Sequence, residues 1–147
     1  MPRASLLLDD QLCFVLYATS RAITAAYRPL LEPLRLTYPQ YLVMLVLWES
    51  DKLTVRELGK RLYLDSGTLT PLLKRLEKTR YIERKRNAGD GREVLLALTA
   101  AGRRLKVRAA PIPEKMTCKV RIAQGRAVRL RTELRAVLSK LTLIDGK

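Results

Sequence analysis

Residues 64–77 read LDSGTLTPLLKRLE, and this stretch decides the fold of the chain. Asp65 and Ser66 are residue types that cap the N-termini of helices. Leucines then follow at steps of three, one and three, which places them on one face of a helix that ends near Arg80. Pro71 conflicts with this pattern, but a proline close to the first turn is tolerated. The leucines are Leu69, Leu72, Leu73 and Leu76.

A shorter helix comes immediately before this one. The segment TVRE at 54–57 matches a capping box, in which a threonine caps the helix and a glutamate three residues later reaches back to it. Leu58 and Leu62 follow one helical turn apart, so both are predicted to face the core. Two short helices in succession are typical of a helix-turn-helix motif.

A β-hairpin is predicted after these helices. The segments YIERKR at 81–86 and EVLLAL at 93–98 have the composition of strands, and NAGDGR at 87–92 has the Asn, Gly and Asp of a turn. A helix-turn-helix followed by a basic hairpin is a winged helix-turn-helix, which is a DNA-binding unit.

Further helices flank this unit. Apolar residues at helical spacing predict one helix from about Asp9 to Tyr27, which Pro29 and Pro33 break off, and another over 39–49. After the hairpin, Thr99 caps a basic helix that runs to about residue 110. Two prolines then interrupt the chain before a short helical segment over 113–120.

The last helix has apolar residues at alternating steps of three and four. This heptad-like seam suits another helix. Because so small a unit cannot cover apolar faces at both ends, we expect two chains to pair. The seam residues are Ala127, Leu130, Leu134, Val137 and Leu141.

The predicted fold class is mainly α with a small β-hairpin wing. We expect residues 1–147 to form a single domain of 147 residues. Within it, the winged helix-turn-helix covers about 38–98, and dimerisation helices cover about 9–28 and about 99–143.

The charge of the chain predicts a polyanionic partner. Lys and Arg number 29 against 14 Asp and Glu, which gives a formal net charge of +15. A field of this size attracts nucleic acid, and RNA-binding and nucleoid proteins share it. Charge alone therefore leaves a nonspecific nucleic-acid-binding protein open.

Several classes of function lack the residues they need. The chain has no His, and its two Cys cannot form a four-cysteine metal site. Neither common phosphate-binding glycine pattern occurs. No apolar stretch approaches the roughly 18–20 residues of a membrane span. We therefore expect no enzyme, metal, cofactor or membrane association, and a cytoplasmic location with reduced thiols.

The polar side of the helix over 66–80 fits a DNA major groove. Hydroxyl groups and arginine reach base edges there, and lysine reaches phosphate. A solvated amphipathic face is the simpler interpretation of the same pattern. The residues concerned are Ser66, Thr68, Thr70, Lys74 and Arg75.

The hairpin is also basic, with Arg84, Lys85, Arg86 and Arg92 around its tip. Arginine at a narrow tip suits the minor groove, whose negative potential attracts a guanidinium group. Asp90 would orient Arg92 through an ion pair. An exposed hairpin with ordinary surface charge is the alternative.

The two cysteines allow more than one interpretation. Cys13 lies in the apolar run LCFVLY at 12–17, where a buried small hydrophobic residue is the ordinary interpretation. Asp9 and Asp10, one turn back, disfavour a thiolate, whereas the nearby helix N-terminus favours one. Cys118 lies among lysines, which favour a thiolate if the side chain is exposed.

Three segments together resemble the MarR family: LDSGTLTPLLKRLE at 64–77, DGR at 90–92 and LTAAG at 98–102. The closer resemblance is to its organic-hydroperoxide-sensing repressors, the OhrR group. In that group the first helix carries one reactive cysteine, and tyrosines hydrogen-bond its thiolate.

This resemblance implies that Cys13 is the sensor. It also implies that Tyr27 and Tyr38 hydrogen-bond the thiolate and that Tyr17 occupies a nearby pocket position. The segment PEKMTC at 113–118 is similar to the second-cysteine region of the two-Cys branch, so Cys118 is implied as the second redox residue.

The mechanism implied by the resemblance begins when an organic hydroperoxide oxidises Cys13 to a sulfenic acid. Cys118 of the other subunit then condenses with it to a disulfide. The movement that this bond requires releases a homodimeric repressor from double-stranded operator DNA. The alternatives are a MarR-type repressor released by a small aromatic effector and a thiol peroxidase.

Overall fold

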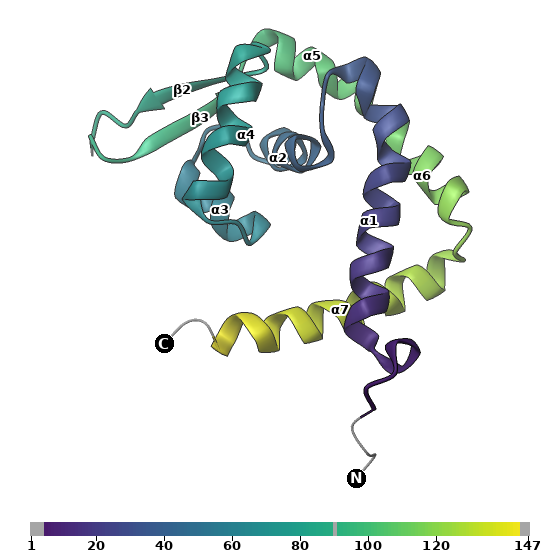
Figure 1. The fold of residues 1–147 in the computed structure, drawn as a ribbon. Coiled ribbons are helices and arrows are strands. Elements are labelled where there is room, and N and C mark those ends of the chain that lie inside the picture. Colours follow the sequence, from purple (N-terminus) through teal and green to yellow (C-terminus); the bar gives the residue numbers. More distant parts are fainter. Residues whose placement is uncertain (1–4, 90, 145–147) are drawn as a thin grey trace. The chain divides into compact units, whose positions relative to one another are not determined.

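The computed structural model describes residues 5–89 and 91–144 (Figure 1). The chain is mainly helical with one small antiparallel sheet, which confirms the predicted fold class. It divides into two compact units, residues 1–112 and 113–147.

The first unit contains all the strands of the described residues and every helix from η1 to α5. Its elements are η1 (Leu8–Asp10), α1 (Leu12–Leu31), η2 (Glu32–Leu34), α2 (Tyr38–Glu49), β1 (Leu53–Thr54), α3 (Val55–Leu62), α4 (Ser66–Lys78), β2 (Ile82–Arg86), β3 (Val94–Leu98) and α5 (Ala100–Ala109).

Side-chain caps fix where the helices of the first unit begin. The Thr54 hydroxyl accepts the Glu57 N–H at 3.1 Å, and the Glu57 carboxylate accepts the Thr54 N–H at 2.7 Å, which confirms the capping box. Asp65 caps α4 by accepting the Thr68 N–H at 2.7 Å. Thr37 and Gln40 form a second capping box at the start of α2, which was not predicted from the sequence.

The core of the first unit lies between α2, α3, α4 and the sheet. Leu58 of α3 is fully buried, as are the predicted inward residues Leu69, Leu73 and Leu76 of α4. Leu72, on the same predicted face, is only half-buried. The helix α2 contributes the largest share of apolar side chains to this core: Tyr41, Val43, Met44, Val46 and Leu47.

The sheet has three strands in the order β1-β3-β2, all antiparallel. The β2–β3 hairpin has the expected position, with Ile82 opposite Leu98 and Arg86 opposite Val94. The two-residue strand β1 is an addition to the predicted hairpin, and it anchors the start of α3 to the sheet.

The prediction that Pro29 breaks the first helix is wrong. Pro29 lies inside α1, which continues to Leu31. A proline removes one hydrogen bond and strains the preceding turn, but Leu31 is completely buried, and this burial stabilises the last turn. Pro33 lies in η2, where the helix geometry has already changed. Pro71 is accommodated inside α4, as expected.

The second unit contains α6 (Ile112–Val120), apart from its first residue, and α7 (Gln124–Ile144). The apolar residues of α7 whose side chains are described are largely exposed, including Leu130, Leu134, Val137 and Leu141 of the predicted seam. Among the described residues, no helix is both long enough and apolar enough to cross a membrane.

Candidate nucleic-acid interface and thiol site

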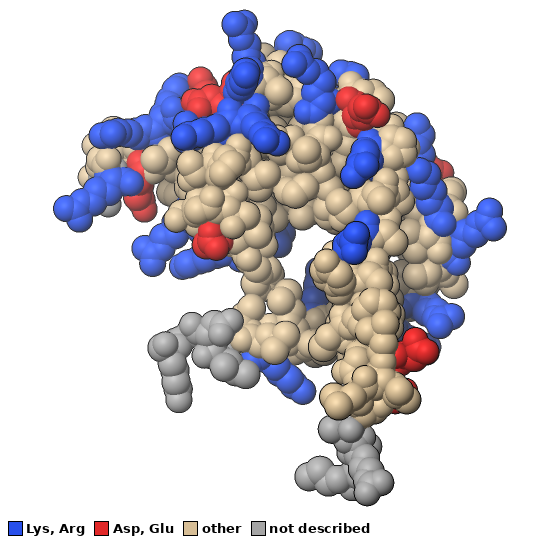
Figure 2. All heavy atoms as spheres, viewed as in Figure 1, with Lys and Arg blue, Asp and Glu red and all other residues tan. Residues whose placement is uncertain are grey.

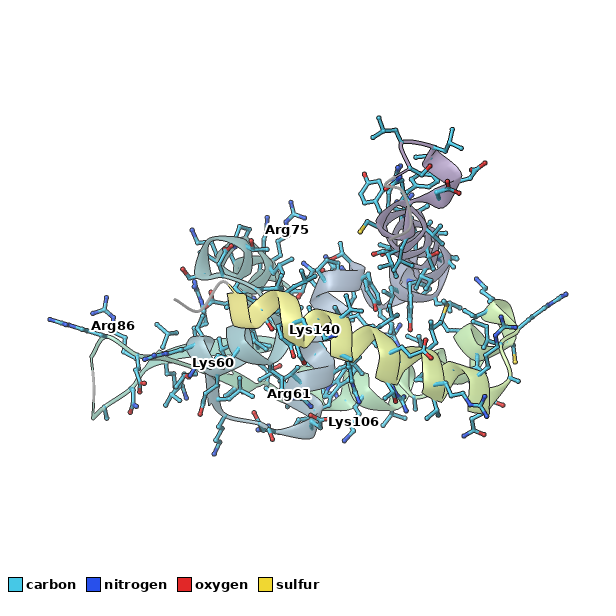
Figure 3. The ribbon with its side chains drawn as sticks, turned by 90° about the horizontal axis from the view of Figure 1, so that it is seen from below. Lys60, Arg61, Arg75, Arg86, Lys106 and Lys140 are labelled. Carbon is cyan, nitrogen blue, oxygen red and sulfur yellow. The ribbon has the colours of Figure 1, made fainter. Side chains whose placement is uncertain are left out.

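The helix α4 presents one polar face to solvent. Its leucines hold the opposite face in the core, and the predicted DNA-contacting residues on the helix are all exposed. The Thr70 hydroxyl donates to the Ser66 carbonyl at 2.7 Å, so this side chain bonds to its own helix in the DNA-free chain. Figure 3 shows Arg75 projecting away from the helix. The exposed residues are Ser66, Thr68, Thr70, Lys74 and Arg75.

The hairpin extends beyond the packed part of the sheet. Arg86 and Arg92 are exposed near its tip, and Figure 3 shows Arg86 pointing outward. The Asn87 amide donates to the Glu93 carboxylate at 2.9 Å and joins the two arms of the tip. Asp90, the predicted partner of Arg92, lies outside the described residues.

The cations of the hairpin do not all have the same surroundings. Figure 2 shows Lys and Arg side chains gathered over the hairpin. Arg84, however, is only partly exposed and forms an ion pair with Glu77 of α4. Lys85 pairs more loosely with Glu83 at 3.3 Å on the exposed side. Spacing along the strand does not reveal this contact, so the sequence pattern alone places Arg84 with the other cations of the hairpin.

Cys13 lies in the first turn of α1, and its thiol is exposed and free. Its neighbours Leu12, Phe14 and Val15 are also 40–65% exposed. Within one chain, therefore, Cys13 is not the buried small hydrophobic residue of the ordinary interpretation. It is a thiol on an uncovered apolar surface. Cys118, on α6, is likewise exposed and free.

Three tyrosines form a cluster at the other end of α1. The ring centroids of Tyr27 and Tyr38 lie 4.6 Å apart, and Tyr41 lies 5.7 Å from Tyr27 and 6.5 Å from Tyr38. Trp48 meets Tyr41 edge-on at 6.4 Å. Tyr41 was not predicted, although its position three residues after Tyr38 on α2 places both on one side of that helix.

Burial keeps these tyrosines protonated. Desolvation, with a smaller contribution from the neighbouring phenols, raises the pKa of Tyr27 to about 12. The pKa values of Tyr38 and Tyr41 are also raised, chiefly by desolvation. At neutral pH each hydroxyl is therefore a hydrogen-bond donor, which is the form that a nearby thiolate requires.

The structure brings Tyr27 and Tyr38 together but keeps Tyr27 away from Cys13 of the same chain. Both Cys13 and Tyr27 lie on α1, fourteen residues apart. At about 1.5 Å of rise per residue, this corresponds to about 21 Å along the helix axis. Tyr17 is one turn from Cys13, and its ring lies 5.5 Å from the Arg21 guanidinium carbon.

Known proteins similar to this chain are transcriptional regulators. A family model described as transcriptional regulator SarA/Rot matches residues 25–108. The organic hydroperoxide resistance transcriptional regulator of Bacillus subtilis is 57% identical over 106 residues, which are 72% of this chain and 72% of that relative.

Solved structures of regulators also match. Reduced AbfR bound to DNA is 34% identical, with a TM-score of 0.79 over 91% of this chain and 93% of AbfR, a protein of Staphylococcus epidermidis. The disulfide form of AbfR, 33% identical, gives a TM-score of 0.66 over 89% of this chain and 92% of AbfR. MarR shares the fold, with a TM-score of 0.77 at 21% identity over 97% of this chain and 99% of MarR.

Proposed function

This chain belongs to the MarR family of transcriptional regulators, in the organic-hydroperoxide-resistance group, and we propose that it is a homodimeric repressor that releases its operator when an organic hydroperoxide oxidises Cys13. The observation that carries the proposal is the exposed Cys13 thiol among exposed apolar side chains. Such a surface suits an oxidant with an apolar organic group, and an accessible thiol is the one that oxidises.

DNA binding is assigned to α4 and the hairpin. The polar face of α4 would enter the major groove, with Ser66, Thr68, Thr70 and Arg75 near base edges and Lys74 on phosphate. Arg86 and Arg92 would follow the minor groove, and Asp90 would orient Arg92. The shared fold with AbfR, which has been solved bound to DNA, supports this arrangement. Because operator DNA lies in the cytoplasm, the proposal places the chain there.

Pairing of two chains accounts for the surfaces that one chain leaves uncovered. Exposed apolar residues follow the N-terminal part of α1 and the length of α7. Because Tyr27 is about 21 Å along α1 from Cys13 of its own chain, a Tyr27 hydroxyl that serves a thiolate would come from the partner. We therefore assign the sensor pocket to Cys13 and Tyr17 of one subunit together with Tyr27 and Tyr38 of the other.

The chemistry needs only the two thiols and the peroxide. The Cys13 thiolate attacks the outer peroxide oxygen, the O–O bond breaks, and an alcohol leaves after taking up a proton. This step oxidises the sulfur to a sulfenic acid. The thiolate of Cys118 from the partner then attacks that sulfur, forming the S–S bond and releasing hydroxide. The Cys13–Cys118 disulfide requires the Cα atoms of the two cysteines to lie within about 7 Å of each other. Forming it therefore moves the helices that carry them and changes the distance between the two DNA-binding faces of the dimer.

The test uses three proteins: the wild type, Cys13→Ser and Cys118→Ser. Each is titrated against a duplex selected by the reduced wild type from a randomised pool, with fluorescence anisotropy as the readout. Cumene hydroperoxide should release the wild type, and dithiothreitol should restore binding. Cys13→Ser should bind the duplex and ignore the peroxide. Cys118→Ser should form the sulfenic acid, trapped by dimedone, and overoxidise.

Electrophoresis separates the possible disulfides and the competing functions. Oxidised wild type should run as a covalent dimer without reductant, whereas a monomer-sized band with an internal Cys13–Cys118 bond would refute the intersubunit assignment. Peroxide-dependent release by Cys13→Ser would refute the sensor. Sustained peroxide consumption with dithiothreitol would instead indicate a thiol peroxidase.

A further inference from the structure

Glu77 and Arg84 link the two elements that are assigned to different DNA grooves. Glu77 lies in the last turn of α4, and Arg84 lies in the middle of β2. The Arg84 Nε donates to the Glu77 Oε2 at 2.9 Å, and its Nη2 lies 2.8 Å from the same oxygen. Two guanidinium nitrogens on one carboxylate oxygen hold the direction of the side chain as well as its distance.

The position of Arg84 in the sheet explains why it faces α4. Side chains alternate along a strand, so Ile82, Arg84 and Arg86 share one face of β2. Ile82 is buried in the core on that face, and α4 packs against β2. Arg84 is therefore at an inward position where a charge has to be paired. Arg86, two residues nearer the tip, is exposed on the same side.

This ion pair is less exposed than the Arg61–Glu49, Lys85–Glu83 and Arg103–Asp51 pairs. Its side chains are 30% and 40% exposed, whereas each of those three pairs has at least one side chain that is 54% exposed or more. A partly desolvated pair is less screened by salt than a surface pair and holds its geometry better. Although β1, α2, α3 and α5 contact β3, α4 packs against β2, the strand that carries Arg84, so this contact helps to set the direction of the hairpin.

We propose that Glu77 and Arg84 are positioning residues for DNA binding: their ion pair fixes the hairpin relative to α4, so that both elements reach the grooves of one duplex. The inference rests on the proposed function. If it is correct, Arg84 does not contact DNA directly. Glu77, although acidic, then favours the binding of a polyanion.

The substitution Glu77→Gln separates positioning from direct contact by the sign of its effect. If Arg84 contacted phosphate, neutralising Glu77 would free it and remove a repulsive charge, so DNA binding would tighten. If the pair positions the hairpin, DNA binding should weaken about tenfold, which corresponds to about 1.4 kcal/mol. The matched control is Glu49→Gln, which breaks the exposed Arg61–Glu49 pair of α3 and α2. This control should bind no more weakly than the wild type.

The experiment measures affinity for the duplex selected by the wild type, together with hydroxyl-radical footprints. Weakened binding by Glu77→Gln with loss of minor-groove protection, but not by Glu49→Gln, supports the inference. Binding by Glu77→Gln that equals or exceeds wild-type binding overturns it. If the wild type itself selects no duplex, the proposed function and this inference both fail.

A charge swap covers the case in which Glu77→Gln folds poorly. Arg84→Glu alone places two carboxylates together and should weaken binding. Adding Glu77→Arg restores an ion pair of the opposite sense and should recover most of the lost affinity. Failure of the folded double variant to recover affinity overturns the inference.

Discussion

We call the winged helix-turn-helix region, residues 53–98, the reading head, and the N-terminal part of α1, residues 12–27, the sensor arm. These two regions differ in how much of their structure a single chain completes. The reading head has capped helices, a closed leucine core and a sheet that joins its two ends. In the sensor arm no residue is fully buried, and α1 reaches the core only at Leu31. One chain therefore suffices to build the reading head, whereas the proposed sensor needs two.

The largest effect is expected from core truncation in the reading head. Leu69 is 1% exposed, so Leu69→Ala should lower the free energy of unfolding by about 2–5 kcal/mol. Leu12 is 65% exposed in the single chain, and in the proposed dimer the partner would cover it. The unfolding midpoint of Leu12→Ala should therefore shift most at low protein concentration. Urea unfolding at two protein concentrations measures the effects of both substitutions. A shift of the Leu12→Ala midpoint that does not depend on protein concentration would contradict the view that the sensor arm needs a partner chain.

The next effect concerns operator affinity alone. Arg92→Ala should weaken binding to the selected duplex by about 1–3 kcal/mol, because a minor-groove guanidinium is lost, and Arg75→Ala should weaken it by a similar amount through the major groove. The rate of Cys13 oxidation should not change in either variant. Arg104→Ala, which removes an exposed charge of α5, is the control. If Arg92→Ala and Arg75→Ala bind the duplex as tightly as Arg104→Ala does, the assignment of DNA binding to the reading head is wrong.

A smaller effect should follow from removing the Tyr27 hydroxyl, which the proposed sensor pocket places beside the Cys13 thiolate of the partner chain. The raised pKa of Tyr27, about 12, keeps its hydroxyl protonated as a donor across the physiological range. Tyr27→Phe should slow oxidation by cumene hydroperoxide about tenfold, or about 1.4 kcal/mol, and leave DNA binding intact. Stopped-flow measurement of thiol loss gives the rate.

Mixed dimers decide which chain supplies that hydroxyl. A dimer of one Cys13→Ser chain and one Tyr27→Phe chain retains a single Cys13 thiol, with Cys118 present in both chains. If Tyr27 acts across the interface, this thiol faces an intact tyrosine and should react at the wild-type rate. If Tyr27 acts within its own chain, the rate should match that of Tyr27→Phe.

The smallest effect should be a pH dependence at the base of the hairpin. Partial burial opposes ionisation of Asp51, but the Leu98 N–H and the Arg103 guanidinium, both at 2.9 Å, outweigh it and lower the pKa of the carboxyl. Its contribution to stability is therefore present above the ordinary carboxyl pKa and is lost as pH falls through the lowered value. Asp51→Asn should be less stable than the wild type at neutral pH, and the difference should vanish in acid. A difference that persists or grows in acid would contradict this sign.

Local rules sufficed for much of the reading head. The caps at Thr54 and Asp65 are set by residues three positions away, so short-range patterns predict them. The strand β1 was missed because two residues carry no alternation, and its pairing with β3 depends on contacts more than forty positions along the chain. The Glu77–Arg84 pair was missed for a related reason, because only the packing of α4 on β2 brings the two together.

The proposed sensor site follows from the sequence only in part. Resemblance pointed to Cys13 and the tyrosines, and the helical rise along α1 could already have shown that Tyr27 cannot reach Cys13 within one chain. The contribution of Tyr41 depends on how α1 meets α2, which no single helix pattern contains.

Trp48 gives the chain a built-in optical reporter. It is the single tryptophan of the sequence, and its indole N–H donates to the Gly102 carbonyl at 2.9 Å while its ring rests against Tyr41. Tyr41 in turn contacts Tyr27. Indole emission responds to changes in hydrogen bonding and in neighbouring rings. Rearrangement of the tyrosine cluster on oxidation would therefore change the intrinsic fluorescence, and the switch could be timed on the native protein without attaching a dye.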